Sequence, residues 1–361
     1  MLPIKKLSDY DKNFDVLTSS SKQDIGFYNI LEEPFKIYGL IDKEHYRRLP
    51  KEFSAKVSGG VDALCRNTAG GRVRFKTDSA YIAVKVFVPT VNLMPHMALA
   101  GSLGLDVYER KDGKYIHIST LLPGWGMDTI NNIENNGYYD CMIEFKDKRI
   151  RDITINFPLY NDVNDIFVGI ENSSKLIAGD EYTNKKTVVY YGSSITQGGC
   201  ASRPGNAYSH ILSRRFDNDF YNLGFSGSAK GEEEIAEYIA DMNMDIFVYD
   251  YDYNTPNPEH LLKTHERMFE IIRNKNPQIP IIILSAPKYY SDTEFNDRRE
   301  IIRKTYNNAL KNGDKNVWFI EGNKIFNVFG GDSCTVDGCH PNDLGFMCMA
   351  EEIQKIMEKV M

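Results

Sequence analysis

Two short segments, far apart in the sequence, hold the residues best suited to chemistry. Ser194 follows the apolar run Val188–Gly192, and Asp337 and His340 stand near the end of the chain with two residues between them. A serine hydroxyl, an imidazole and a carboxylate supply a nucleophile, a general base and a group that orients the base. Together they are sufficient for acyl transfer through a serine ester, a reaction that needs no metal and no cofactor.

Groups that could stabilise a developing oxyanion lie in two further segments. The stretch Asn222–Ser228 contains Gly227, which leaves its backbone N–H unobstructed, and Asn254 ends the run Asp250–Asn254. Taken alone, each is an ordinary loop, turn or helix N-cap. Both follow predicted strands, in the order that a site would need. We therefore expect an oxyanion hole made by the backbone N–H groups of Ser194 and Gly227 and the side chain of Asn254.

Several side chains could shape a substrate pocket beside these groups. Arg203 could bind a polar or anionic substrate group, or it could pair with a nearby carboxylate. Trp125 lies between two glycines and could stack on a sugar face or anchor a turn. Asp252 and Tyr253 stand at a predicted strand end and are expected to contact substrate. His96 could be reached from the same face, although a packed core position is favoured for it.

The second half of the chain alternates between strand and helix patterns, and this alternation must position the candidate residues. Strand candidates, with nearly continuous apolar centres, cover residues 187–191, 220–223, 246–251, 279–285 and 317–321. Helical patterns cover residues 206–216, 232–241, 258–274, 297–310 and 342 to the end. Such alternation predicts a doubly wound parallel sheet, in which ligands bind at the carboxyl ends of the strands.

The first half has a different texture. Short apolar runs at 81–88, 105–108, 114–118 and 139–145 are separated by turn formers such as Asp112-Gly113 and Pro123-Gly124. Close spacing of strands with almost no helical periodicity predicts an antiparallel β-sandwich. A polar stretch around 171–186 places the junction near residue 180. The predicted domains are therefore residues 1–180, an accessory sandwich, and residues 181–361, the catalytic unit.

Composition excludes several classes of protein. The chain has 361 residues, a formal net charge of -7, 42% hydrophobic and 26% charged residues. A net negative charge gives no reason to expect nucleic acid or an anionic membrane as partner. No run approaches the roughly 18 apolar residues of a membrane span. The amino terminus has no apolar h-region, so we expect no secretion signal and a cytoplasmic location. A homo-oligomer is compatible with the sequence.

Six cysteines in a chain of this length favour a reduced compartment over a disulfide framework. Cys334, Cys339, His340 and Cys348 could be considered as zinc ligands, but they lack a paired CxxC knuckle. We therefore expect no metal, and interpret these cysteines as small buried residues beside the site.

The four segments that bear chemistry resemble the four blocks of SGNH (GDSL-type) hydrolases. The resemblance implies a nucleophile at Ser194, oxyanion donors at Ser194, Gly227 and Asn254, an orienting acid at Asp337 and a base at His340. It also implies a flavodoxin-like catalytic fold. Two departures stand out: Gly192-Ser193-Ser194 replaces Gly-Asp-Ser, and Asp252-Tyr253-Asn254-Thr255 replaces Gly-x-Asn-Asp.

The resemblance narrows to a branch that carries an amino-terminal β-sandwich, jelly-roll-like in form, with the signature Gly-x-Asp-Leu-Tyr. Here the signature reads Gly104-Leu105-Asp106-Val107-Tyr108. Chains of this kind often deacetylate sugars, so we expect a serine esterase that removes a short acyl group, with acetyl preferred, from a carbohydrate or a small-molecule ester. The alternatives are a lysophospholipase, a thioesterase or an acyltransferase on the same residues, or an inactive carbohydrate-binding protein.

Overall fold

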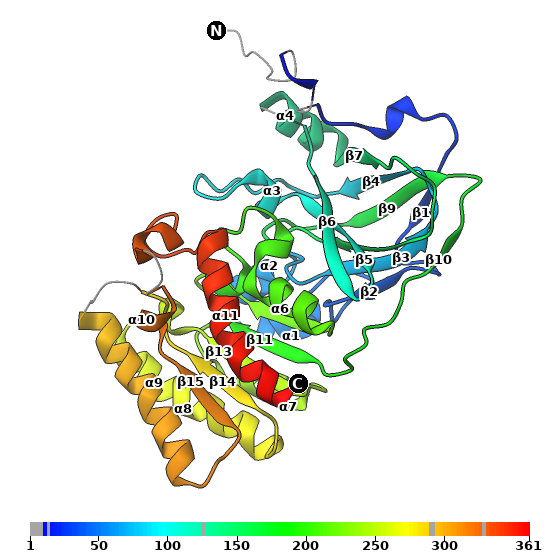
Figure 1. The fold of residues 1–361 in the computed structure, drawn as a ribbon. Helices are drawn as coiled ribbons and strands as arrows, with labels where there is room; N and C mark the ends of the chain where they lie inside the picture. Colours follow the sequence, from blue (N-terminus) through cyan, green and yellow to red (C-terminus); the bar gives the residue numbers. More distant parts are fainter. Residues whose placement is uncertain (1–9, 13–14, 125–126, 289–292, 327–329) are drawn as a thin grey trace.

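The computed structural model describes residues 10–12, 15–124, 127–288, 293–326 and 330–361. Its first half contains two antiparallel sheets (Figure 1). One sheet has the order β1 (Ile25–Asn29), β9 (Asp165–Glu171), β4 (Tyr81–Phe87) and β7 (Tyr138–Glu144). The other has the order β10 (Leu176–Ala178), β3 (Arg72–Thr77), β8 (Arg151–Asn156), β5 (Leu105–Lys111) and β6 (Lys114–Leu121), with β2 (Lys36–Tyr38) also paired to β3.

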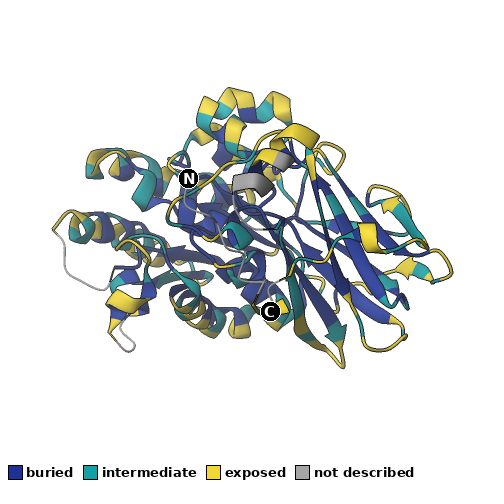
Figure 2. Cartoon of the chain, turned by 90° about the horizontal axis from the view of Figure 1, so that it is seen from above, coloured by how far each residue is buried: buried dark blue, intermediate teal, exposed yellow. Residues whose placement is uncertain are grey.

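The two sheets pack face to face. Alternate side chains of β4, including Val84 and Val86, share one buried cluster with Val73 of β3, Val107 of β5 and Ile155 of β8. Figure 2 shows these strands as largely buried, with the exposed residues gathered on the connecting loops. Alternation of inward apolar residues on facing sheets is the arrangement of a β-sandwich. The predicted antiparallel sandwich is confirmed.

The first half also contains helices, which the sequence did not predict. They are α1 (Lys51–Val57), α2 (Gly59–Leu64), α3 (Leu99–Ser102) and α4 (Met127–Asn136). The first two do not belong to the sandwich core. Leu49, Val61 and Cys65 are buried in a cluster formed mainly by the second half of the chain. Residues 49–65 therefore pack on the other side of the predicted junction, although residue 180 itself falls between β10 and the next strand.

The second half forms one parallel five-stranded sheet. Its order is β12 (Phe220–Gly224), β11 (Val188–Gly192), β13 (Ile246–Asp250), β14 (Ile281–Leu284) and β15 (Val317–Ile320). The first strand of this unit thus lies second in the sheet, and the chain winds outward from it in both directions. This is the flavodoxin-like order of a doubly wound sheet, as predicted.

Helices cover both faces of this sheet. They are α5 (Ser194–Gln197), α6 (Tyr208–Phe216), α7 (Glu233–Asp241), α8 (Pro258–Lys275), α9 (Thr293–Lys311), α10 (Gly322–Ile325) and α11 (Asp343–Val360). Single 3-10 turns in this half are η4 (Pro204–Asn206), η5 (Asp252–Asn254) and η6 (Gly331–Cys334), whereas η3 (Ser19–Ser21) lies beside β7 of the sandwich. Among these described helices, none is long and apolar enough to cross a lipid bilayer.

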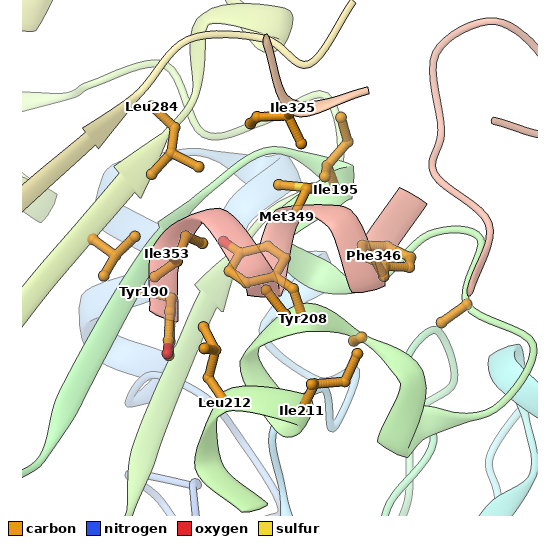
Figure 3. Close-up of a cluster of buried hydrophobic side chains, with 14 of the residues drawn as sticks. Tyr190, Ile195, Tyr208, Ile211, Leu212, Leu284, Ile325, Phe346, Met349 and Ile353 are labelled. Atoms are coloured by element: carbon orange, nitrogen blue, oxygen red, sulfur yellow. The ribbon is translucent and has the colours of Figure 1, made fainter. Parts of the chain in front are cut away.

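An apolar stripe decides which face each helix covers. On α11, Phe346, Met349 and Ile353 recur at helical spacing and pack with Tyr208 of α6 and Tyr190 of β11 (Figure 3). Buried residues of α7, α8 and α9 form the separate cluster on the opposite face. Burial on both faces explains why the strands have nearly continuous apolar sequences.

Candidate active site

The carboxyl ends of three neighbouring strands meet at one edge of the parallel sheet. Gly192, the last residue of β11, is in register with Gly224 of β12 and with Asp250 of β13. A Cβ on Gly192 would lie 1.9 Å from Asp250 Oδ1 and 2.3 Å from Thr196 Oγ1. Only glycine fits there, so the chain can turn directly from the strand into the short helix α5.

Ser194 is the first residue of that helix. Ser193 caps it, because its hydroxyl accepts a hydrogen bond from Ile195 N at 3.2 Å. The turn also receives support from the sandwich half, since Tyr160 donates its hydroxyl to the carbonyl of Ser194 at 3.0 Å. Ser194 is 7% exposed. The nucleophile candidate is therefore held on a short, well-supported turn at the carboxyl edge of the sheet.

The structure brings the three side chains of the predicted triad together. Ser194 Oγ lies 2.9 Å from His340 Nε2, and His340 Nδ1 lies 2.8 Å from Asp337 Oδ2. These are ordinary hydrogen-bond distances between groups at opposite ends of the catalytic half. The arrangement allows a proton to pass from the serine to the imidazole while the carboxylate orients the ring.

The charge state of Asp337 fixes the tautomer of the ring. Burial alone would raise the pKa of Asp337, but hydrogen bonds from the His340 ring and from the backbone N–H groups of His340 and Cys339 outweigh it and lower the pKa to about 2. An ionised carboxylate can only accept, so Nδ1 of His340 carries the hydrogen in this pair. Nε2 then has a free lone pair, which can accept the hydroxyl proton of Ser194.

Backbone contacts hold the histidine loop against the serine turn. Cys200 N donates to the carbonyl of Pro341 at 3.0 Å, and Val336 N donates to the carbonyl of His340 at 2.9 Å. Directly afterwards, Asn342 caps α11 by accepting from the N–H groups of Leu344 and Gly345. The loop that carries His340 is thus bonded at both of its ends.

Two of the expected oxyanion donors, Gly227 and Asn254, lie together and are bonded to each other. Gly227 N donates to Asn254 Oδ1 at 3.1 Å, and Asn254 Nδ2 donates to the carbonyl of Phe225 at 2.9 Å. These two bonds fix the amide orientation of Asn254, with Nδ2 as the donor side. An amide nitrogen has a second hydrogen. Asn254 can therefore donate to an oxyanion as it stands, whereas Gly227 must share or release its present bond.

Arg203 occupies the alternative position considered for it. Its guanidinium pairs with Asp106 at 2.8 Å and also donates to the hydroxyl of Tyr108. Asp106 accepts from Gly205 N at 2.8 Å and from Asn156 Nδ2 at 2.7 Å as well. In this structure Arg203 joins the sandwich to the loop after the nucleophile, and a contact with substrate stays a prediction.

The remaining pocket candidates differ in position. Asp252 is 1% exposed, and its Oδ2 accepts from Ala286 N at 2.9 Å, so the carboxylate holds two strand ends together instead of facing solvent. Tyr253 is half-buried and donates its hydroxyl to the carbonyl of Pro287 at 3.3 Å. Trp125 lies outside the described residues.

One set of contacts was missed from sequence, and one residue was named as reachable from the site but assigned a core position. The motif residues Asp106 and Tyr108 were given no contact, yet they bind the loop that follows Ser194. His96 was favoured as a core residue, yet it is half-buried with its ring centroid 5.2 Å from that of His340. The signal for the first was the acid within a short apolar strand. For His96 the sequence suggested access from the catalytic face but not its closeness to His340, because only the fold brings residue 96 beside residue 340.

Two family models match consecutive parts of the chain. Residues 185–358 match the GDSL-like lipase/acylhydrolase family, and residues 25–176 match the N-terminal domain of SGNH hydrolase-type esterases, named for its GxDLY motif. No curated protein matches the chain.

Solved structures share the whole two-part architecture. A protein described as a GDSL-like lipase from Bacteroides ovatus has 27% identity, with 93% of this chain and 98% of that chain covered and a TM-score of 0.83. The salicylyl-acyltransferase SsfX3 of a tetracycline biosynthetic pathway has 19% identity, coverage of 94% and 98%, and a TM-score of 0.73. An acetyl xylan esterase from Butyrivibrio proteoclasticus has 13% identity, coverage of 93% and 98%, and a TM-score of 0.56. The last two similarities are evidence of fold alone.

Proposed function

Because the chain belongs to the GDSL-like lipase/acylhydrolase family and carries the N-terminal domain of SGNH hydrolase-type esterases, we propose that it is a serine esterase that removes an acetyl group from a carbohydrate. The observation that carries the proposal is the hydrogen-bonded series from Ser194 through His340 to Asp337. A carbohydrate-binding protein without activity would not need the serine hydroxyl, the imidazole and the carboxylate to be hydrogen-bonded in series.

The reaction follows from this geometry. Ser194 Oγ attacks the ester carbonyl while its proton moves to His340 Nε2, and Asp337 stabilises the imidazolium that forms. The oxyanion is bound by the second hydrogen of Asn254 Nδ2, by the backbone N–H of Ser194 and by Gly227 once its bond to Asn254 Oδ1 is released. His340 then protonates the leaving hydroxyl, and water hydrolyses the acetyl-enzyme by the same groups in reverse.

A hollow with both polar and apolar side chains in its lining supports a carbohydrate as the leaving group. It has a volume of about 320 Å³ and is lined by Ala63, Leu64, Arg66, Asn67, Thr90, Asn92, Met94, Tyr160 and Asp162. Tyr160 also donates its hydroxyl to the backbone carbonyl of Ser194, so one lining residue of the hollow contacts the nucleophile turn. A second hollow shares Arg66 and Asp162 with the first and continues to His45 and Lys51. Amide, hydroxyl and charged groups along such a path suit sugar hydroxyls better than a fatty acyl chain.

The choice of acetyl rests on two further grounds. An acetyl xylan esterase is among the proteins that share this two-part fold. In addition, charged side chains such as Arg66 and Asp162 interrupt the lining of the described hollows, and a long acyl chain would need a continuous apolar surface. We therefore place the sugar in the hollow and only a small acyl group at the serine.

The first experiment is turnover of p-nitrophenyl acetate and of longer nitrophenyl esters by the wild type and by Ser194→Ala. We expect activity that falls with acyl chain length and disappears in the variant. No turnover by the wild type, together with no labelling by a serine-directed phosphonate, would contradict the proposal and favour a carbohydrate-binding protein.

The leaving group is tested separately with Arg66→Ala. We expect a raised KM for acetylated oligosaccharides and an unchanged KM for p-nitrophenyl acetate, because only the former reaches the hollow. Arg267→Ala, at a partly exposed arginine of α8 that pairs with Glu233, is the matched control. Equal KM values in all three proteins would place the sugar elsewhere.

Transfer to an alcohol instead of water is the second candidate, since a salicylyl-acyltransferase shares the fold. Adding acceptor alcohols during turnover distinguishes the two. Products that contain the acceptor in place of free acetate would identify an acyltransferase on the same triad.

A further inference from the structure

A cluster of three potential metal ligands forms where the two halves of the chain meet at the active site. One ligand atom from each of His96, Cys200 and His340 lies within 4.8 Å of the other two. His96 comes from the segment between β4 and α3, Cys200 from the loop after α5, and His340 from the histidine loop. This is not the group of Cys334, Cys339, His340 and Cys348 that the sequence suggested as the possible zinc ligands.

The segment that carries His96 is anchored beside Cys200. Met97, the next residue, is buried in the same cluster as Cys200 and Ala201. In α3, Gly101 approaches so closely that a Cβ on it would lie 2.0 Å from the carbonyl of Ala201. His96 itself is half-buried and is therefore able to turn its ring while its neighbour stays fixed.

We propose that His96, Cys200 and His340 form an inhibitory binding site for a divalent metal of the zinc type. Two imidazoles and one thiolate are ligands that Zn²⁺ prefers, and three protein ligands plus a water complete a tetrahedron. Ligand atoms of a tetrahedral zinc lie roughly 3.3–3.8 Å apart, given bond lengths of about 2.0–2.3 Å. The present separations, all within 4.8 Å, need to shorten by about 1.5 Å at most, which requires side-chain rotations.

His340 already has the hydrogen bond that such a ligand needs. A metal-bound histidine commonly donates its other ring N–H to a carboxylate, which fixes the tautomer. Nδ1 of His340 donates to Asp337 Oδ2 in this way, so Nε2 is the nitrogen left for the metal. Nε2 is also the atom 2.9 Å from Ser194 Oγ. A metal bound there takes the lone pair that would accept the serine proton, and catalysis stops.

The thiol of Cys200 must lose its proton when the metal binds. Burial, with a smaller contribution from Asp337 and Cys339, raises the pKa of Cys200 to about 12, so without metal it is a neutral thiol. On binding, the S–H bond breaks, a sulfur–metal bond forms and one proton passes to solvent. The same neutral thiol leaves catalysis undisturbed when no metal is present.

Binding of Zn²⁺ is measured first by isothermal titration calorimetry on the full chain after treatment with a chelator, in the wild type and in Ser194→Ala. Ser194→Ala keeps all three ligands, so this arm does not depend on the proposed esterase function. We expect one Zn²⁺ per chain in both proteins. His96→Gln and Cys200→Ser should each weaken binding at least about tenfold, the lower end of the loss seen when the support of a metal site is removed.

Inhibition is the second readout, and this arm does rest on the proposed function. Zn²⁺ should abolish hydrolysis of p-nitrophenyl acetate by the wild type, a chelator should restore it, and both ligand variants should keep their activity at metal concentrations that inhibit the wild type. His260→Gln and Cys348→Ser are the controls, because each removes a residue of the same type outside the cluster.

Zinc binding of equal strength in the wild type, His96→Gln and Cys200→Ser would overturn the proposal. Equal weakening by the two controls would overturn it too. Should the buried Cys200→Ser variant fail to fold, as judged by circular dichroism, His96→Gln at its half-buried position gives the decisive comparison.

Discussion

Asn254 illustrates how much a single side chain does at this site. Its amide accepts from Gly227 N and donates to the carbonyl of Phe225, so it positions the loop that holds the other oxyanion donor. Ser193 is a second case. It stands where the family has aspartate, and its hydroxyl caps α5. Serine and aspartate are both strong N-cap residues, so the turn keeps its cap without the carboxylate.

We expect Asn254→Ala to lower kcat by about 10²–10³, the usual cost of one oxyanion donor. KM for p-nitrophenyl acetate should change little, since the donor acts on the transition state more than on the bound ester. Steady-state kinetics provide the measurement. Asn308→Ala removes an amide that bonds Glu266 away from the site and is the control. A fall in KM equal to the fall in kcat would argue against an oxyanion role.

At the scale of elements, the end of β13 carries a buried acid that the mechanism does not use. Asp250 accepts a hydrogen bond from the hydroxyl of Thr196, while its Oδ2 is buried without a partner among the described residues. Complete burial, together with the nearby charge of Asp252, raises the pKa of Asp250 to about 8 despite that hydrogen bond. The serine turn is therefore built on a carboxyl group that stays protonated at neutral pH.

This pKa makes stability depend on pH. The folded protein keeps a proton on Asp250 between about pH 4 and pH 8, whereas the unfolded chain releases it near pH 4. The free energy of unfolding contributed by this group therefore falls as pH rises through that window. Asp250→Asn cannot ionise, so its Tm relative to the wild type should increase steadily from pH 5 to pH 8. Thermal scans at pH 5 and pH 8 provide the measurement. The same difference in Tm between Asp250→Asn and the wild type at both pH values would contradict the raised pKa of Asp250.

The GxDLY motif contributes at the same scale. Asp106 of β5 is fully buried and receives hydrogen bonds from Arg203, Gly205 and Asn156. The strand that carries it belongs to the sandwich, whereas Arg203 and Gly205 belong to the loop that follows the nucleophile. The motif therefore connects the two halves and positions that loop.

Asp106→Asn should lower the free energy of unfolding by about 1.5–3 kcal/mol, because it removes the fully buried charged acceptor to which Arg203 and Gly205 donate. It should also lower kcat/KM, since the loop at Arg203 also carries Cys200, which bonds the histidine loop. Chemical denaturation and ester hydrolysis test both effects. Glu233→Gln, which breaks the exposed pair with Arg267, should leave stability nearly unchanged. Similar losses of unfolding free energy in Asp106→Asn and Glu233→Gln would show that the burial of Asp106 does not cause the effect.

At the scale of the whole molecule, the two halves share their packing. Arg48 donates to the carbonyls of Gly224 and Asn222 in β12 and to that of Leu64 in α2. Arg72 of β3 pairs with Asp219, next to the start of β12. With residues 49–65 buried against the parallel sheet, neither half has a complete surface of its own.

We therefore expect one cooperative unfolding transition for the whole chain, with equal calorimetric and van't Hoff enthalpies. A fragment of residues 181–361 should expose the apolar surface that Val61 and Leu49 cover and bind a hydrophobic dye. Differential scanning calorimetry and dye fluorescence provide the measurements. Two separate transitions, or a fragment that unfolds cooperatively by itself, would show that the halves are independent domains.

The sequence alone determined the fold class and singled out the three side chains that form the hydrogen-bonded series. Strands buried on both faces have continuous apolar runs, helices have stripes, and both patterns depend only on neighbouring residues. The five parallel strands were therefore predicted within one or two residues at most ends, from Val188–Gly192 to Val317–Ile320. Ser194, Asp337 and His340 stood out because their types and order suit one reaction.

Only the tertiary structure decided what those residues meet. The short helices within residues 51–64 contain too few residues to show a clear helical periodicity. They are stabilised by packing on the parallel sheet, whose strands lie more than a hundred residues later in the chain. The pairing of Arg203 with Asp106, the bond between Gly227 and Asn254, and the approach of His96 to His340 all join residues far apart in the chain. Such contacts cannot be predicted from the local sequence around either residue, because they form only when the two halves pack together.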